Sequence, residues 1–274
     1  MNKITILGSG DTLGTPVAGC NNPSCIDEDP KSKRFRFGLL LEIEGKKILI
    51  DTNPDLKWQC LQSGFELKDI DYLLISHTHS DHVNGMGEFF YRRPLPIPTY
   101  FPDHPLALKH MDYFRYLERE EVLSFIPYSN YEPFNLTDTI RVTPVDLNHG
   151  FPCSGFIIET GNTKIGVISD TNLKMSDKTM MALNNCDYLF ADAFSEDIEQ
   201  VKKVYIECGL EAPDLNSEWF HMTIPEAKQV QELTKSKKLY TMHMSRHMSP
   251  HKELVEKYQT DKFIIGFDNL VVSF

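Results

Sequence analysis

Short apolar runs of strand length alternate with longer segments along most of the chain, and glycine or proline marks many of the boundaries. The apolar runs predict strands over residues 4–7, 38–43, 47–51, 72–76, 140–145, 155–159, 164–169, 188–192, 238–243 and 263–265. The longer segments predict helices over residues 54–63, 83–88, 105–117, 177–184, 198–208 and 225–234. Strands in two groups with helices between them predict an α/β fold, with two stacked sheets covered by helices on their outer faces.

Size and charge narrow the possible functions. A chain of 274 residues with 41% hydrophobic residues fits one large domain, 1–274, with a sizeable core. The net charge of −11 argues against a sequence-independent nucleic-acid binder, because phosphate contacts need clustered Lys and Arg. No stretch approaches the roughly 20 apolar residues of a membrane span, and no signal peptide is evident, so no membrane partner and a cytoplasmic location are expected.

Three histidines and an aspartate stand within six residues after the predicted strand 72–76, in the sequence YLLISHTHSDHVNG. Alternate side chains at a strand end point to the same side, so His77 and His79 are expected to point together. Asp81 and His82 follow on the turn into a helix and can face a second point nearby. Imidazole nitrogens and carboxylate oxygens are ligands of Zn²⁺, and they also suit Mn²⁺ or Fe²⁺, so this segment predicts a metal site.

The H-x-H-x-D-H pattern after a hydrophobic strand resembles the hallmark of the metallo-β-lactamase superfamily. That family has an αββα sandwich fold of two mixed β-sheets flanked by helices, with the metals at one edge. Its remaining ligands match His149 in PVDLNHG, Asp170 in VISDTN and His243 in LYTMHMS, in the family's order. The resemblance implies two divalent metal ions, zinc or manganese. Their ligands would be His77, His79 and His149 for one, Asp81, His82 and His243 for the other, and Asp170 as the bridge.

Two further segments resemble one branch of this superfamily. The opening ILGSGDTLGTPVAGC resembles the glycine-rich start of PhnP-type phosphodiesterases, and FHMTIPEAKQV resembles a segment of those enzymes and of the tRNA 3′-processing endonucleases. The resemblance implies that His221 contacts the scissile phosphate or protonates the leaving oxygen. The alternative is a solvent-exposed histidine beside a capping box of Thr223 and Glu226. Asp81 is assigned to catalysis as well as to metal binding. Asp51, in ILIDTN, either orients a ligand histidine or is a turn residue.

PhnP-type enzymes also carry a structural zinc site made by three cysteines and a histidine. In this chain the corresponding loop, GCNNPSC, lacks one cysteine, and Arg246 stands where the family histidine would be. A third, structural zinc held by Cys20, Cys25 and His247 is therefore one interpretation. The other is a loop held by packing, with both cysteines reduced.

The function predicted from these residues is a dinuclear metal-dependent phosphodiesterase that hydrolyses a small cyclic or nucleotide-like phosphodiester by attack of metal-activated hydroxide. Three alternatives remain: a tRNA 3′-processing-type ribonuclease, a thioester or lactam hydrolase, and a non-catalytic metal-bound sensing or binding module. The expected partner is a small phosphodiester rather than a nucleic acid, and the resemblance allows a homodimer. The aromatic-rich helix with Tyr113, Phe114 and Tyr116 is expected beside the metals, with core packing or a dimer contact as the alternative.

Overall fold

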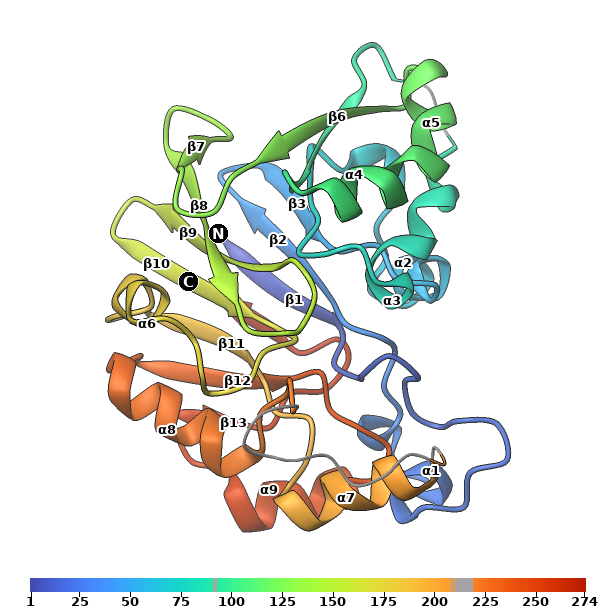
Figure 1. The fold of residues 1–274 in the computed structure, drawn as a ribbon, viewed down its shortest axis with the longest axis vertical. Helices are drawn as coiled ribbons and strands as arrows, with labels where there is room; N and C mark the ends of the chain where they lie inside the picture. The colour runs from blue at the N-terminus through green and yellow to red at the C-terminus, as the bar shows by residue number, and fades with distance from the viewer. Residues whose placement is uncertain (91–92, 208, 210–218) are drawn as a thin grey trace.

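The computed structural model describes residues 1–90, 93–207, 209 and 219–274. One group of strands comprises β1 (Lys3–Gly8), β2 (Gly38–Ile43), β3 (Lys46–Ile50), β4 (Tyr72–Leu74), β5 (Ile97–Pro102), β6 (Leu123–Tyr128) and β14 (Val271–Ser273). The other comprises β7 (Phe134–Asn135), β8 (Ile140–Leu147), β9 (Cys153–Thr160), β10 (Thr163–Ile168), β11 (Tyr188–Asp192), β12 (Lys238–Met242) and β13 (Phe263–Ile264). Over the described ranges these form two seven-stranded sheets, ordered β14-β1-β2-β3-β4-β5-β6 and β13-β12-β11-β10-β9-β8-β7 (Figure 1).

The helices follow the strands in the order expected for a layered α/β protein. The α-helices are α1 (Pro23–Ile26), α2 (Leu56–Ser63), α3 (Ser80–Val83), α4 (Pro105–Met111), α5 (Arg115–Arg119), α6 (Asp177–Ala182), α7 (Ile198–Glu207), α8 (Ile224–Thr234) and α9 (His251–Tyr258). Short 3₁₀ helices are η1 (Pro30–Ser32), η2 (Leu67–Asp69), η3 (Asn84–Glu88) and η4 (Asp112–Phe114). Among the helices that the structure describes, none is long and apolar enough to cross a membrane.

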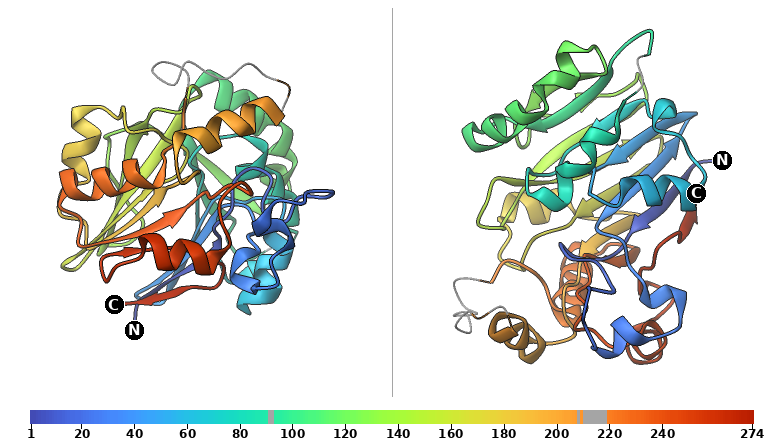
Figure 2. Two further views of the ribbon diagram at one scale, coloured as in Figure 1. Left: turned by 90° about the horizontal axis from the view of Figure 1, so that it is seen from below. Right: turned by 90° about the vertical axis from the view of Figure 1, so that its right-hand side faces the viewer.

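Apolar side chains fill three layers. The central layer lies between the two sheets, where Phe156 is fully buried. A second layer packs Leu56 of α2 and Met111 of α4 on the outer face of the first sheet. A third packs Val230 of α8 and Leu254 of α9 on the outer face of the second sheet. Figure 2 shows the helices on both outer faces of the paired sheets. The predicted αββα sandwich of two mixed β-sheets is therefore confirmed.

Strand direction brings the polar segments to one edge of each sheet. Strands β3 to β6 are parallel to one another, and so are strands β10 to β13. Strand β9 is antiparallel to both β8 and β10, so β8 runs in the same direction as β10. The polar residues predicted as metal ligands all follow the carboxyl ends of β4, β8, β10 and β12. Their side chains can meet because these ends lie at one edge of the sandwich.

The sequence pattern missed the short strands β7 and β14 and two longer strands of the first sheet that contain proline. Strand β5 (IPTYFP) contains Pro98 and Pro102, and strand β6 (LSFIPY) contains Pro127. Proline has no N–H to donate to the ladder, so such segments are poor strand candidates by sequence. The single predicted helix 105–117 is in fact divided into α4, η4 and α5. The predicted helix 198–208 corresponds to α7, and Cys208 lies outside the described residues.

Glu196 joins α7, α9 and the loop between β12 and α9. Its buried carboxylate accepts hydrogen bonds from the backbone N–H and hydroxyl of Ser249, at 2.8 and 2.6 Å, from Lys257 at 3.0 Å and from the Tyr258 hydroxyl at 3.2 Å. Burial would raise the pKa of Glu196, but these hydrogen bonds outweigh it and lower the pKa from 4.5 to about 2. The ionised carboxylate therefore stabilises the folded state.

A Glu196→Gln variant is expected to lower the free energy of unfolding by about 2 kcal/mol at pH 7, because hydrogen bonds to a charged group are lost. Since the folded pKa is depressed, this stabilisation is present above the ordinary pKa of 4.5 and is lost as the pH falls toward about 2. Urea unfolding of both proteins at pH 7 and pH 3 measures the difference. A difference that is unchanged at pH 3 would contradict the assigned ionisation.

Candidate metal centre

Three histidine rings converge at the end of β4. His77 Nε2 lies 3.0 Å from His79 Nδ1, and His149 Nε2 lies 3.2 Å from the same His79 nitrogen. A neutral imidazole has only one donor and one acceptor nitrogen, so three nitrogens facing one point cannot all satisfy one another. Burial lowers the pKa of His77 well below its usual range and that of His149 to about 3. The rings are therefore neutral, which is the form that binds a metal ion.

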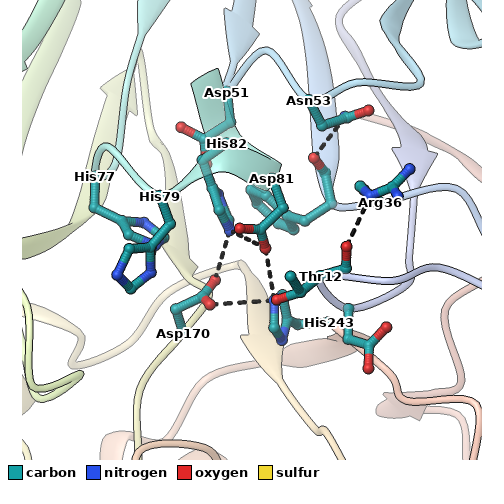
Figure 3. Close-up of polar contacts among 12 residues, drawn as sticks. Thr12, Arg36, Asp51, Asn53, His77, His79, Asp81, His82, Asp170 and His243 are labelled. Carbon is teal, nitrogen blue, oxygen red and sulfur yellow. Dashed lines mark hydrogen bonds and ion pairs between the residues drawn. The ribbon is translucent and has the colours of Figure 1, made fainter. Parts of the chain in front are cut away.

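A second cluster lies beside the first and contains two carboxylates and two imidazoles (Figure 3). His82 Nε2 lies 3.3 Å from Asp81 Oδ2 and 3.2 Å from Asp170 Oδ2, and His243 Nε2 lies 3.1 Å from Asp170 Oδ1. Both Nε2 atoms and Asp170 Oδ2 are buried without a well-formed hydrogen bond. Buried nitrogen and oxygen atoms without hydrogen-bond partners fit a site for a divalent cation, to which they would bind as ligands.

The charges of the second cluster support the same interpretation. Burial alone would raise the pKa of Asp170, but the nearby His243 and His82 outweigh it and hold the pKa well below its usual range. Burial would lower the pKa of His243, but Asp170 and Asp81 outweigh it and raise the pKa to about 9. Two ionised carboxylates in a buried site provide the negative charge that a divalent cation requires.

Asp170 lies between the two clusters. Its Oδ1 is 3.1 Å from His243 Nε2 in the second cluster and 3.6 Å from His149 Nε2 in the first. The structure thus brings together all the residues predicted as metal ligands, in the two groups that the family resemblance implies, with Asp170 between them. Asp170 would thus be available to a metal ion held by either cluster. The metal itself, zinc or manganese, stays a prediction.

Three strand ends at this centre adopt left-handed backbone conformations. Asp51, Asp170 and His243 have φ angles of 60°, 54° and 56°. Such conformations are uncommon for residues other than glycine, and they concentrate at functional sites, where the surrounding structure imposes them. The side chains of Asp170 and His243 meet in the second cluster, and Asp51 contacts His82.

Asp51 supports the second cluster through its contact with His82. Its Oδ2 lies 2.7 Å from His82 Nδ1, and its carboxylate also accepts hydrogen bonds from the backbone N–H and the hydroxyl of Ser76, each at 2.7 Å. A carboxylate on Nδ1 keeps that nitrogen protonated and directs Nε2 toward the other ligands. Of the two interpretations of Asp51, the structure thus favours the orienting carboxylate.

An Asp51→Asn variant is expected to bind its second metal about 10- to 100-fold more weakly, because His82 loses the carboxylate that fixes its tautomer. Titration of the metal-free protein with Zn²⁺ or Mn²⁺, followed by calorimetry, measures this affinity. Asp71→Asn is the matched control, since Asp71 pairs with Lys46 away from the centre. Equal affinities in all three proteins would show that Asp51 has no such role.

His221 lies beside the metal centre without belonging to either predicted ligand set. Its Nδ1 is 2.7 Å from Asp192 Oδ2, and its ring stacks on His243 at a centroid distance of 4.9 Å and an angle of 7°. His149, Asp170 and His221 also bring donor atoms within 4.8 Å of one another. The capping box of Thr223 and Glu226 is present too, but His221 is half-buried rather than solvent-exposed. The cap begins α8 and holds the preceding His221 in place.

Asp192 is a functional candidate that sequence reasoning missed. It is fully buried, ends β11, and accepts hydrogen bonds from the backbone N–H groups of Phe194 and Met222 as well as facing His221. The available signal was its position: a carboxylate that closes a buried strand at the same edge as the ligands. Only the tertiary structure shows that its partner lies 29 residues further along the chain.

The predicted structural zinc site is not assembled in the described part of the chain. Cys25 is buried and Cys20 is half-buried, whereas His247 Nδ1 contacts the Asn22 side-chain amide at 3.2 Å. The other nitrogen of His247 lies 3.5 Å from Glu207. Among the described residues, Cys20, Cys25 and His247 do not form a group of donors within 4.8 Å of one another. A third zinc therefore stays a prediction without a formed ligand set.

Comparison with protein families and characterised sequences gives consistent matches. A family model described as "Beta-lactamase superfamily domain" matches residues 46–244. An octanoyltransferase of Porphyromonas gingivalis is 27% identical over 267 residues, which cover 93% of this chain and 48% of that protein. A ribonuclease Z of Methanopyrus kandleri is 28% identical over 139 residues, which cover 48% of this chain and 46% of that protein. The chain thus spans about half the length of these relatives.

Solved structures share the fold over the whole chain. A crystal structure described as a new diphosphatase from the PhnP family superposes with a TM-score of 0.80 at 24% identity, covering 100% of this chain and 97% of that one. Zn²⁺-bound PqqB from Methylobacterium extorquens also gives a TM-score of 0.80, at 16% identity, covering 99% of this chain and 100% of that one. Human tRNase Z, short form, gives 0.68 at 20% identity, covering 99% and 98%. At these identities the likeness shows the fold alone.

Proposed function

Because the chain belongs to the beta-lactamase superfamily, through a family model that matches residues 46–244, we propose that it is a dinuclear metal-dependent phosphodiesterase. The substrate class is a small cyclic or nucleotide-like phosphodiester. The fold and the two ligand clusters support a metal-binding hydrolase, and the arrangement of His221 beside them supports phosphodiester cleavage.

The observation that carries the proposal is the position of His221 at the border of the two clusters. His221 is held by its contact with Asp192 and by stacking on His243. Its ligand atom lies within 4.8 Å of those of His149 and Asp170. A hydrolase that cleaves a phosphodiester needs a proton donor for the departing alkoxide, and a histidine is suited to this near neutral pH. A metal cage alone would serve lactam or thioester cleavage equally well.

Each residue has a defined part in this proposal. When bound, two divalent ions neutralise a phosphoryl oxygen and lower the pKa of a water molecule from about 15.7 to about 7. The two clusters would hold these ions, and Asp170 lies within reach of both. Asp192 Oδ2 accepts a hydrogen bond from Nδ1–H of His221 and so orients the ring, which leaves Nε2 as the atom that, in the imidazolium form, donates a proton to the leaving oxygen.

Elemental analysis paired with turnover of bis(p-nitrophenyl) phosphate on the same preparation tests the proposal. Two metals per chain together with turnover are expected. Two metals without turnover of any phosphodiester would overturn the phosphodiesterase assignment and favour another ester class or a binding role. A preparation purified without chelators that holds no metal would overturn the metal centre itself.

A tRNA 3′-processing-type ribonuclease is a second candidate, because ribonuclease Z proteins are among the relatives. The net charge of −11 weighs against it, since RNA binding depends on clustered cations. Retention of tRNA on the protein at two ionic strengths separates the candidates. Strong retention that falls steeply with salt, together with 3′ cleavage, would favour the ribonuclease.

Hydrolysis of an acyl thioester should also be assayed, because an octanoyltransferase is among the relatives. The chain covers 48% of that protein, so the octanoyl-transfer activity named for the whole protein cannot be carried over to this half. An octanoyl thioester assayed beside the phosphodiesters would reveal such an activity.

Association into a homodimer and a cytoplasmic location also stay predictions.

A further inference from the structure

Aromatic rings continue from the metal centre toward the outer helices of the first sheet. The His79 ring packs on Phe151 at a centroid distance of 4.6 Å, and Phe151 stacks on His110 of α4 at 5.7 Å and an angle of 13°. On the other side, His79 contacts His149 at 5.1 Å, and His149 contacts His221 at 5.1 Å. Five rings thus form one series, with His221 at one end and His110 at the other.

His110 is fixed in this position by the ligand loop itself. Its Nδ1 lies 3.0 Å from the Thr78 hydroxyl and 3.2 Å from the Thr78 carbonyl oxygen, and Thr78 stands between two predicted ligands. One face of the His110 ring is occupied by Phe151, yet the residue as a whole is exposed. His110 therefore presents an exposed ring beside the ligand loop.

Tyr113 extends the exposed aromatic surface. It lies three residues after His110 on the continuous α4–η4 segment, so the two side chains share one face. Tyr113 is 78% exposed, whereas Phe114 is 4% exposed and belongs to the core. The first arginine after this face, Arg115, is bonded to Asp112 and Glu118. Arg115 is thus engaged in ion pairs, whereas the exposed Tyr113 ring provides a surface for stacking.

We propose that His110 and Tyr113, with Phe151 packed behind His110, form a stacking shelf for a nucleobase-like planar ring carried by the phosphodiester on the side away from His221. This inference rests on the proposed function and narrows it to nucleotide-type substrates. The shelf is continuous with the metal ligands through His79, so a phosphate at the metals can carry a ring that reaches it. Stacking on aromatic faces is tolerant of base identity, because every base has a π-face. The shelf should therefore favour a base without selecting one.

Two esters with the same leaving group test the shelf. Thymidine 5′-(p-nitrophenyl) phosphate carries a base on the retained group, and methyl p-nitrophenyl phosphate does not. The metal-loaded wild-type protein is expected to have a kcat/KM about tenfold higher for the thymidine ester, mainly through KM, as expected for one or two stacking contacts. His110→Ala and Tyr113→Ala should each lower kcat/KM for the thymidine ester more than for the methyl ester, and so reduce this preference.

His110→Phe separates stacking from support of the loop, because it keeps a ring and removes the contacts of Nδ1 with Thr78. It should retain the preference for the thymidine ester; loss of the preference in this variant would overturn the shelf. Trp58→Ala is the matched control, since Trp58 is an exposed aromatic residue of α2. A wild-type protein that turns over both esters equally would also overturn the shelf but leave the proposed function intact.

Equilibrium binding keeps the shelf testable if neither ester is hydrolysed. Thymidine 5′-phosphate and methyl phosphate are titrated into the metal-loaded protein and followed by calorimetry. Tighter binding of the thymidine compound, lost in His110→Ala and Tyr113→Ala, would support the shelf even if the phosphodiesterase assignment failed. Equal affinities for the two phosphates would overturn it.

Discussion

An Asp170→Ala variant is expected to lose both metals and to hydrolyse phosphodiesters roughly 10⁴-fold more slowly. Asp170 is the carboxylate that lies between the clusters, 3.1 Å from His243 Nε2 and 3.6 Å from His149 Nε2. Its removal leaves both donor sets incomplete. Metal ions contribute several kcal/mol to stabilisation of the transition state, and each 1.4 kcal/mol corresponds to about a factor of ten in rate.

An Asp81→Ala variant is the matched comparison. Asp81 Oδ2 lies 3.3 Å from His82 Nε2 and 3.9 Å from His243 Nε2, within the second cluster only. This variant should retain about one metal per chain, held by the three imidazoles of the first cluster together with Asp170, and still lose nearly all activity. Elemental analysis and kcat/KM on the same preparations check both variants. Two metals and the full rate in Asp81→Ala would show that the ligand assignment is wrong.

A His221→Ala variant is expected to slow cleavage of an alkyl phosphodiester by about 10²- to 10⁴-fold, the usual contribution of a general acid. The effect should be small for a p-nitrophenyl ester, because p-nitrophenolate departs without needing a proton. The dependence on the leaving group separates a proton donor from a residue that only binds phosphate. An equal loss with both substrates would assign His221 to binding instead.

Asp192→Asn tests the group that holds His221. The amide cannot favour the Nδ1-protonated tautomer as the carboxylate does, so the same leaving-group dependence is expected with a smaller loss. Asp187→Asn is the control, because Asp187 pairs with Lys237 at the opposite end of β11. Metal content should remain at the wild-type value in both variants. Loss of metal in Asp192→Asn would instead place Asp192 among the ligands.

Much of the fold followed from local patterns. Strands such as 38–43 and 188–192 were predicted with the bounds that the structure shows, because continuous apolar runs are typical of strands buried on both faces. Strands β5 and β6 were missed, since their prolines are unfavourable by local preference. Their burial between helices and the central layer outweighs that preference, and only tertiary packing provides it.

The candidate metal ligands could be recognised from the sequence without the structure. The spacing of His77, His79, Asp81 and His82 after a buried strand fixes which side chains can point together, because backbone geometry sets the direction of neighbouring residues. The order of His149, Asp170 and His243 along the chain carried the rest through family resemblance. The spacing within one segment and the order of residues along the chain are both visible in a single sequence.

The tertiary structure alone decided which residues support that chemistry. Asp192 contacts His221, which lies 29 residues further along the chain. Phe151, in the loop between β8 and β9 of the second sheet, packs against His110 of α4, which covers the first sheet. It also left His247 facing Asn22 and Glu207 rather than joining Cys20 and Cys25. Such contacts depend on how two sheets and their helices pack. Side chains distant in sequence approach one another only once that packing is complete, so no spacing rule along the chain can predict them.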